Sequence, residues 1–284
     1  MSGRPELYDV GLMAEPTLER SHLTEKGARF RALHSGPGAF VIANAWDAGS
    51  ARLLLDLKLF PAIATSSAAA AMSQGLRDGQ LGRDRSLANA RQIVSACDPL
   101  PVSADLENGF GESPATVAET IRLAAATGLV GASIEDAGEG HGPVYDRSLA
   151  VERIAAGVEA ARSVGFPFTL TARAENFIRE RPDLEDTIER LRAYERAGAD
   201  VLFAPGLPTL DSVREVCAAV TKPVNFMAGV PGRSFSVADL TAAGVRRISL
   251  AASLYRAAIG GMVAAVTEVA TQGTFTYTER IWKG

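Results

Sequence analysis

The sequence lacks the features that would indicate a membrane, secreted or nucleic-acid-binding protein. It has no run of 18 uncharged apolar residues, so no segment is expected to span a membrane. Its two cysteines cannot form a disulfide framework, and the first residues lack the layout of a signal peptide. The net charge is −4, without a basic stripe. These absences favour a cytoplasmic protein that binds neither membranes nor nucleic acids.

What the sequence does contain is a repeated alternation of short apolar runs and helix-period stretches. The chain has 284 residues, 47% of them hydrophobic, which is enough for one large core. The apolar runs cover 39–45, 62–66, 101–105, 131–135, 168–173, 201–205, 223–227 and 246–251. Helical candidates follow them at 48–57, 85–97, 114–126, 148–163, 185–197, 209–220, 236–243 and 253–271.

Eight such units predict a closed parallel (β/α)8 barrel. No GxGxxG follows the first apolar run, which weighs against a dinucleotide-binding fold. We expect one barrel domain over 1–284. It would comprise an N-terminal extension with an extra helix (1–37), the barrel (about 38–260) and a C-terminal helix and tail (261–284).

The last helix is apolar on more than one face. This is typical of a helix that packs between subunits or is swapped between them. A homo-oligomer, either a dimer or a tetramer, is therefore expected. An ordinary last barrel helix is the alternative.

Ionisable residues cluster at the expected carboxyl ends of the strands, where barrel enzymes place their active sites. In the stretch "SADLENGFG", Asp105 and Glu107 share the period-two parity that points both side chains into the barrel mouth. By the same parity, Glu135 and Arg173 should face the interior. The alternative is that these acids cap helices or pair with surface arginines.

Carboxylates on adjacent strands repel one another unless a cation neutralises them. A site of oxygen ligands with water in the remaining positions suits Mg²⁺, with Mn²⁺ as a possible substitute. Asp105, Glu107 and Glu135 are therefore candidate metal-binding residues, and Asp78 in "GLRDG" could join them. Arg173 would clamp a substrate carboxylate in a bidentate way.

Other nucleophiles and bases are scarce. The four lysines lie at the amino ends of strands (Lys58, Lys222) or in the terminal segments (Lys26, Lys283), so a Schiff-base mechanism is not expected. Cys97 and Cys217 are expected to be core thiols. His141, in the glycine-rich loop "EDAGEGHGPVYD", could act as a catalytic acid or base on a lid, or could be an ordinary solvated histidine.

Over about residues 38–260 the chain resembles the isocitrate lyase and phosphoenolpyruvate mutase superfamily. The segments that carry the resemblance are "AWDAGSARL", "AIATSSAAAAMSQGLRDG", "VSADLENGFG", "GASIEDAG" and "TARAENF". The resemblance implies a Mg²⁺ site for 2-oxo or 2-hydroxy carboxylates, and tetramers in which the last helix packs on a neighbouring subunit. It makes Asp105 the principal metal ligand, with Glu107, Glu135 and Asp78 holding the metal's waters. Arg173 would stabilise an enolate or a bound carboxylate. Substrate-binding positions are expected at Trp46, Asp47, Ser66, Ser67, Ala68, Arg173 and Asn225.

The sequence also departs from the family pattern. The loop after the fourth strand reads "AGEGHGPVYD", without the cysteine and basic pair of the isocitrate and methylisocitrate lyases, and without the lid residues of the mutase and phosphonopyruvate hydrolase. The leading hypothesis is a Mg²⁺-dependent lyase or decarboxylase that breaks a C–C bond of a small 2-oxo or 2-hydroxy dicarboxylate. Asp105 and Arg173 would be its catalytic residues, and His141 or Tyr145 its proton donor. A phosphonopyruvate-type P–C mutase or hydrolase and a non-catalytic oxo-acid-binding protein are the alternatives.

Overall fold

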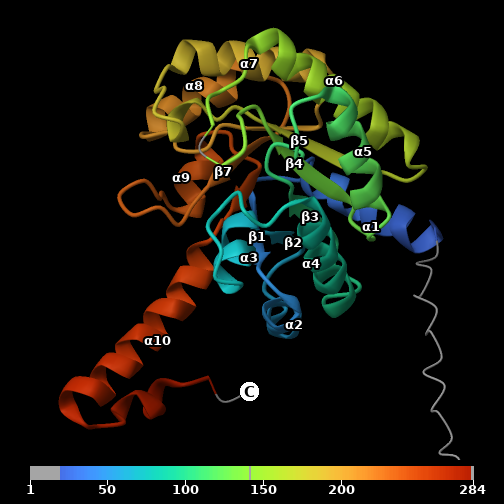
Figure 1. The fold of residues 1–284 in the computed structure, drawn as a ribbon. Helices are drawn as coiled ribbons and strands as arrows, with labels where there is room; N and C mark the ends of the chain where they lie inside the picture. The colour runs from blue at the N-terminus through green and yellow to red at the C-terminus, as the bar shows by residue number, and fades with distance from the viewer. Residues whose placement is uncertain (1–19, 141, 283–284) are drawn as a thin grey trace, which may run out of the picture.

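The computed structural model describes residues 20–140 and 142–282 and shows a closed barrel of eight parallel strands (Figure 1). Each strand pairs with the next, and β8 pairs with β1. The strands are β1 (Phe40–Ala45), β2 (Ile63–Thr65), β3 (Val102–Asp105), β4 (Gly131–Glu135), β5 (Thr169–Arg173), β6 (Val201–Phe203), β7 (Val224–Met227) and β8 (Arg247–Ser249). The predicted (β/α)8 barrel is thereby confirmed. The division into one domain stays a prediction.

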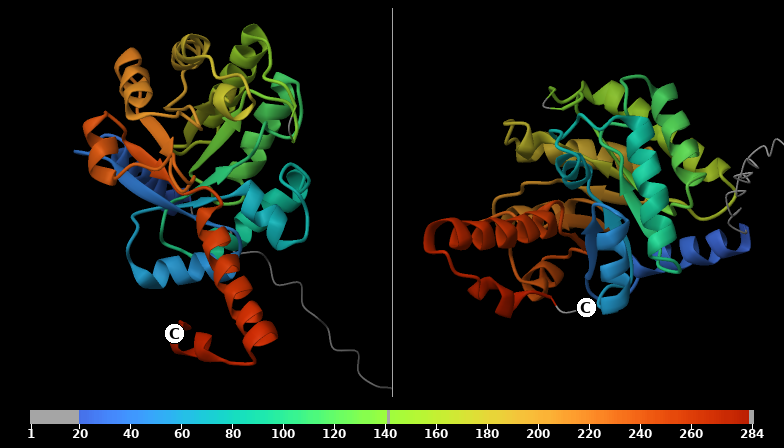
Figure 2. Two further views of the ribbon diagram at one scale, coloured as in Figure 1. Left: turned by 90° about the vertical axis from the view of Figure 1, so that its left-hand side faces the viewer. Right: turned by 60° about the horizontal axis from the view of Figure 1, so that its bottom comes forward.

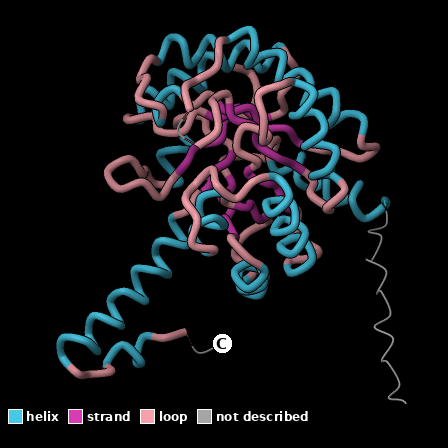
Figure 3. The backbone as a smooth tube through the Cα atoms, in the orientation of Figure 1, coloured by secondary structure: helices cyan, strands magenta, loops and turns pink. Residues whose placement is uncertain are grey.

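The helices surround the strands, which Figure 3 shows as a central ring. They are α1 (Arg20–Leu33), α2 (Ala48–Leu57), α3 (Ser67–Ser73), α4 (Arg83–Ala96), α5 (Pro114–Ala125), α6 (Arg147–Ser163), α7 (Leu184–Arg196), α8 (Leu210–Ala219), α9 (Val237–Ala242) and α10 (Ser253–Gln272). Two 3-10 turns, η1 (Asn176–Ile178) and η2 (Thr276–Arg280), complete the elements. No helix was predicted at α3, which begins two residues after β2 and lies between the predicted apolar run 62–66 and the helical candidate 85–97.

The two faces of the barrel wall differ in chemistry. On β4, Ile134 packs into the apolar core beneath the helices, whereas Glu135 lines the inside. On β5, Leu170 and Ala172 face the helices in the same way. The predicted alternation of faces is thus confirmed. Polar side chains on β1, β3, β4, β7 and β8 also line the lumen: Asn44, Ser103, Ser133, Asn225, Arg247 and Ser249.

The extra N-terminal helix, α1, covers the amino-terminal end of the barrel. Phe30 is completely buried in a small cluster with Ile42 of β1 and Val130, the residue before β4. Gly27 lies so close to the chain before β5 that an added Cβ atom would be 2.1 Å from the carbonyl oxygen of Pro167. A side chain at this position would therefore push α1 away from the barrel.

The last helix, α10, extends away from the barrel, as Figures 1 and 2 show. None of its 20 residues is buried, and the exposed apolar side chains Met262, Val263 and Val266 lie along it. Nothing in this structure shows a partner chain against the helix, so subunit packing stays a prediction. Among the described residues, no helix is both long and apolar enough to cross a membrane.

Candidate active site

A cavity of about 340 Å³ opens at the carboxyl ends of the strands. All eight strands contribute to its lining, through Asn44, Thr65, Asp105, Glu135, Arg173, Phe203, Asn225 and Ser249. Strand-to-helix loops add further ionisable side chains. A barrel fixes the backbone beneath these groups, so they meet at one place although they are far apart in the sequence.

Local backbone geometry aims the two acids of the β3 loop. The backbone of Glu107 has a φ of +50°, and Gly109 follows at +80°, a region that glycine adopts without strain. An added Cβ at Gly109 would lie 3.1 Å from a methyl of Val117, so α5 leaves no room for a side chain there. The carbonyl of Glu107 accepts the N–H of Glu135 at 2.8 Å. This bond joins the β3 loop to the end of β4 and holds both glutamates over the cavity.

Arg173 is the central cation of the site. Its Nη1 atom lies 3.0 Å from a carboxylate oxygen of Asp105 and 3.0 Å from one of Glu135. Its Nε donates to Glu175 at 2.8 Å. These contacts raise the pKa of Arg173 above its ordinary value, although burial acts in the opposite direction. Nη2 takes part in none of these contacts, so two N–H groups are available to a ligand.

The acids of the site carry more negative charge than their neighbours neutralise. Burial and the neighbouring Asp105 raise the pKa of Glu107 to about 8. Its Oε1 atom has no hydrogen-bond partner among the described residues. Burial also raises the pKa of Glu175 to about 8, although Arg173 opposes this shift. Burial, followed by repulsion from Asp105, raises the pKa of Asp78. Such a site attracts either protons or an added cation.

The donor set fits a hard divalent cation. Six carboxylates and four guanidinium groups line the cavity: Asp78, Asp105, Glu107, Glu135, Glu139 and Glu175 against Arg173, Arg179, Arg247 and Arg256. When all are ionised, the excess is two negative charges. Within the described part of the chain, no three His, Cys, Asp or Glu side chains converge as a ready set of direct ligands. The features that fit a hard divalent cation are therefore the carboxylate oxygens and the charge excess at the cavity.

Most of the predicted substrate-binding residues also line the cavity. Ser66, Ser67, Ala68 and Asn225 all do so. The hydroxyl of Ser67 donates to Asp105 at 2.8 Å. Ser66 caps α3 by accepting the N–H of Ala69. The start of α3 thus lies directly beside the carboxylate of Asp105.

Trp46 and Asp47 are not part of the cavity lining. Trp46 packs edge-on against Tyr255, with ring centroids 5.4 Å apart. The Asp47 carboxylate caps α2 by accepting the N–H of Ser50 at 2.7 Å. In this structure both side chains contact neighbouring elements outside the lining, and their contact with substrate stays a prediction. The free thiols Cys97 and Cys217 also lie outside the lining, in agreement with their expected place in the core.

The loop after β4 reaches over the cavity. An added Cβ at Gly79 would lie 2.6 Å from the Cα of Gly140, so the loops after α3 and β4 touch. His141, the predicted lid acid or base, lies outside the described residues. Tyr145, its predicted alternative, does not line the cavity; its hydroxyl accepts a hydrogen bond from Asn108 at 3.2 Å.

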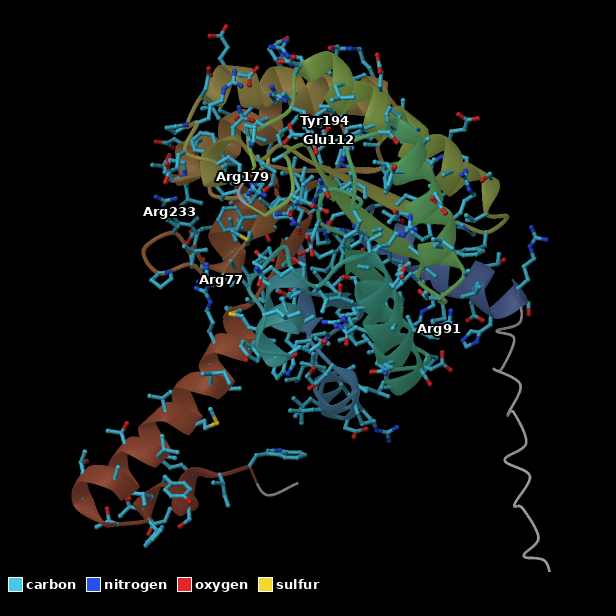
Figure 4. All side chains as sticks on the ribbon, in the orientation of Figure 1. Arg77, Arg91, Glu112, Arg179, Tyr194 and Arg233 are labelled. Carbon is cyan, nitrogen blue, oxygen red and sulfur yellow. The ribbon has the colours of Figure 1, made fainter. Side chains whose placement is uncertain are left out.

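Five ionisable residues of the cavity were not among the predicted site residues: Glu139, Glu175, Arg179, Arg247 and Arg256. Arg179 donates to the carbonyl of Gly140 and, at 3.1 Å, to Glu135, so it ties the loop after β4 to the acid cluster. In Figure 4 it lies on the same side of the barrel as Arg77 and Arg233. The parity of β8, which places Arg247 and Ser249 on one face, could have identified Arg247. Glu175 follows Arg173 by two residues and could have been identified in the same way. No local pattern marks Glu139, Arg179 or Arg256.

A (β/α)8 barrel with ionisable side chains gathered at the carboxyl ends of its strands has the layout of a barrel enzyme. Comparison with known proteins narrows this class. Residues 30–270 match the family model described as phosphoenolpyruvate phosphomutase. The chain therefore belongs to the isocitrate lyase and phosphoenolpyruvate mutase superfamily, a group of lyases and mutases.

Three relatives illustrate this membership. A crystal structure titled as a putative lyase/mutase from Burkholderia cenocepacia is 52% identical with a TM-score of 0.90, and the match covers 93% of this chain and 94% of that one. The 2-methylisocitrate lyase of Salmonella typhimurium is 33% identical over 71% of this chain and 70% of its own length. The oxaloacetate decarboxylase of Bradyrhizobium diazoefficiens is 28% identical over 72% of this chain and 70% of its own length.

Proposed function

We propose that this protein is a Mg²⁺-dependent carbon–carbon lyase or decarboxylase that acts on a small 2-oxo or 2-hydroxy dicarboxylate. The observation that carries the proposal is the contact of one buried guanidinium, that of Arg173, with Asp105 and Glu135 at 3.0 Å each, beside the hydroxyl of Ser67. This cluster offers both a cation site and N–H donors for an anionic oxygen. Similarity to an oxaloacetate decarboxylase and a 2-methylisocitrate lyase supports the choice of substrate class.

Asp105 is the proposed direct ligand of the metal, and Glu107, Glu135 and Asp78 would hold its waters. Mn²⁺, which accepts the same oxygen ligands, is a plausible substitute. When bound, such a cation polarises carbonyl and carboxylate oxygens as a Lewis acid. The unpartnered Glu107 oxygen and its pKa, which burial and then repulsion by Asp105 raise, support this assignment, because a bound cation would relieve both the burial penalty and the repulsion.

Arg173 would stabilise the charge that develops on the substrate. In a 2-hydroxy substrate the hydroxyl loses its proton and becomes a carbonyl, and the electron pair of the broken C–C bond moves onto a carboxylate oxygen of the other fragment. In a 2-oxo substrate the electron pair of the broken C–C bond moves toward the 2-oxo group and leaves negative charge on that oxygen. The free Nη2 of Arg173 can donate to this oxygen, while Nη1 and Nε stay fixed by the acids. Its guanidinium also lies 5.0 Å from the centre of the Phe203 ring, which limits its rotation. A proton from water, His141 or Tyr145 would then complete the product.

Replacing Arg173 by alanine tests this role. We expect the release of pyruvate or CO₂ from oxaloacetate and related 2-oxo and 2-hydroxy dicarboxylates to fall by about 100-fold or more, as for the loss of one donor to a developing oxyanion. The matched control is Arg192→Ala, which removes an arginine that donates to a surface glutamate and a backbone carbonyl. Unchanged turnover in Arg173→Ala would contradict the mechanism.

A phosphonopyruvate-type reaction is the second candidate, and one observation favours it. The sequence shows no basic lid, yet the structure supplies cations at the cavity from other elements, Arg179 after β5 and Arg256 on α10. A transferring phosphoryl group requires such donors. Turnover of phosphonopyruvate in the absence of turnover of the dicarboxylates would select this candidate. Stabilisation by oxo acids with Mg²⁺, but no turnover of either class, would indicate a non-catalytic binding protein.

A further inference from the structure

The floor of the cavity holds a second buried guanidinium, that of Arg247. It lies at the start of β8 and is 5% exposed. Two residues further along the same strand, Ser249 lines the cavity nearer the mouth. Arg247 Nη2 donates to Thr171 on β5 at 3.0 Å. Thr171 precedes Arg173 by two residues, so this guanidinium contacts β5 about 7 Å below the Cα level of Arg173.

Arg247 differs from Arg173 in its partners. Arg173 contacts three carboxylates, whereas no acidic side chain in the described ranges lies within 4.0 Å of Arg247. Its contacts are with neutral acceptors: Asn225 Oδ1 at 2.9 Å, Thr171 Oγ1 at 3.0 Å and, weakly, His34 Nε2 at 3.5 Å. These use three of its five N–H groups and leave one on each terminal nitrogen.

A buried charge without a counter-ion destabilises the fold that contains it. Burial and the nearby Arg173 lower the pKa of Arg247 to about 9, which still leaves it charged at neutral pH. His34 adds no negative charge, because its Nδ1 bonds the carbonyl of Phe30 and Nε2 is then a neutral acceptor. No acidic side chain therefore competes for Arg247 among the described residues, and an anion that enters the cavity from solution can pair with its guanidinium.

We propose that Arg247 forms an anion subsite on the cavity floor, where it binds one carboxylate of the substrate while Asp105 and Arg173 hold the reacting end. The assignment rests on the dicarboxylate function proposed above. A carboxylate paired with a guanidinium loses CO₂ less readily, because the pairing stabilises the charge that would have to leave. The carboxylate at Arg247 is therefore one that the product retains.

Succinate, a dicarboxylate without a reactive 2-oxo or 2-hydroxy group, tests the subsite apart from turnover. Calorimetric titration with Mg²⁺ present should show binding to the wild type that weakens at least tenfold in Arg247→Gln and less in Arg247→Lys. Succinamide, which has a similar length but no charge, should bind neither form. Arg246→Gln is the matched control, since it removes the neighbouring arginine, which does not line the cavity.

Stability separates binding from a purely structural role. Without ligand, Arg247→Gln should melt at the wild-type temperature or above it, because a buried unpaired charge is removed. If the variant does not fold, the wild type labelled with ¹⁵N-histidine gives the answer. The ring signal of His34, one of three histidines and a neighbour of Arg247, should shift with succinate.

Each result has a distinct meaning. Three results would overturn the subsite. The first is equal succinate affinity in the wild type and Arg247→Gln, and the second is no succinate binding by the wild type. The third is a much lower melting temperature of the variant without a change in affinity. Succinate binding that depends on Arg247, together with no turnover of any 2-oxo or 2-hydroxy dicarboxylate, would reject the proposed function and leave the subsite standing.

Discussion

At the scale of single residues, burial of ionisable side chains dominates this protein's chemistry, and His34 shows the consequence for stability. The ring lies between Phe30 and Phe40, with centroids 4.9 and 5.0 Å away. Burial, and secondarily the charge of Arg247, lowers the pKa of His34 from 6.5 to about 3. In the unfolded chain the imidazole takes up a proton below about pH 6.5, whereas in the folded chain it stays neutral down to about pH 3.

The unfolded state thus binds more protons in this window, and stability must fall as the pH is lowered from about 6.5 toward 3. The His34 contribution to the slope approaches about 1.4 kcal/mol per pH unit. We expect His34→Gln to remove this part of the slope when the free energy of unfolding is measured by urea titration at several pH values. His22→Gln, at a half-exposed position beside Asp98, should retain it. An unchanged slope in His34→Gln would show that the ring is not held neutral.

At the scale of elements, α6 holds the loop after β3, which carries Glu107. Arg153 of α6 is 1% exposed and donates to the carbonyls of Asn108, Gly111 and Glu112. Its guanidinium stacks on Tyr145, 4.5 Å from the ring centre. These contacts fix a loop in which Glu107 and Phe110 adopt positive φ values that non-glycine residues avoid.

We expect Arg153→Lys to lower turnover by about 10- to 100-fold, because a single ammonium cannot reproduce the planar fork and small displacements of catalytic groups are costly. The Mg²⁺ concentration for half-maximal activity should rise in parallel. Arg162→Lys is the control on the same helix, where the arginine pairs with Asp200 at the surface. A variant that melts earlier but keeps the wild-type response to Mg²⁺ would limit Arg153 to a structural role.

At the scale of the whole molecule, α10 packs on the barrel only through its first turn, where Tyr255 contacts Trp46 and Leu254 contacts the core. A 20-residue helix with no buried residue exposes Met262, Val263 and Val266 at 52–58% of their surface. Helices in proteins gain most of their stability from packing an apolar face, so a second copy of the chain is the expected partner of α10. Arg256 of the same helix lines the cavity, so assembly and activity should be coupled.

Light scattering of the full chain should give a mass of at least two subunits, and Val263→Glu combined with Val266→Glu should shift the protein toward the monomer. Turnover should fall with the loss of the oligomer. Gln272→Glu, which adds charge at an exposed polar position of α10, should leave the mass unchanged. A monomeric wild type, or an oligomer that tolerates both glutamates, would show that α10 is not the interface.

The sequence by itself determined the barrel, its strand order and the orientation of Asp105, Glu107, Glu135 and Arg173. These features follow from local periodicity: alternation along a strand decides which side chains face the lumen, and parallel strands place their carboxyl ends together.

Only the tertiary structure decided which residues meet. Asp47 follows β1 as plausibly as Asp105 ends β3, yet it turns to cap α2. Arg179 reaches the cavity from the position after the 3-10 turn η1, and Arg256 reaches it from the last helix. Arg247 is unpaired because closure of the barrel brings it to Thr171 and Asn225 rather than to an acid. Such encounters depend on how the closed sheet and its loops pack in three dimensions, which no local pattern records.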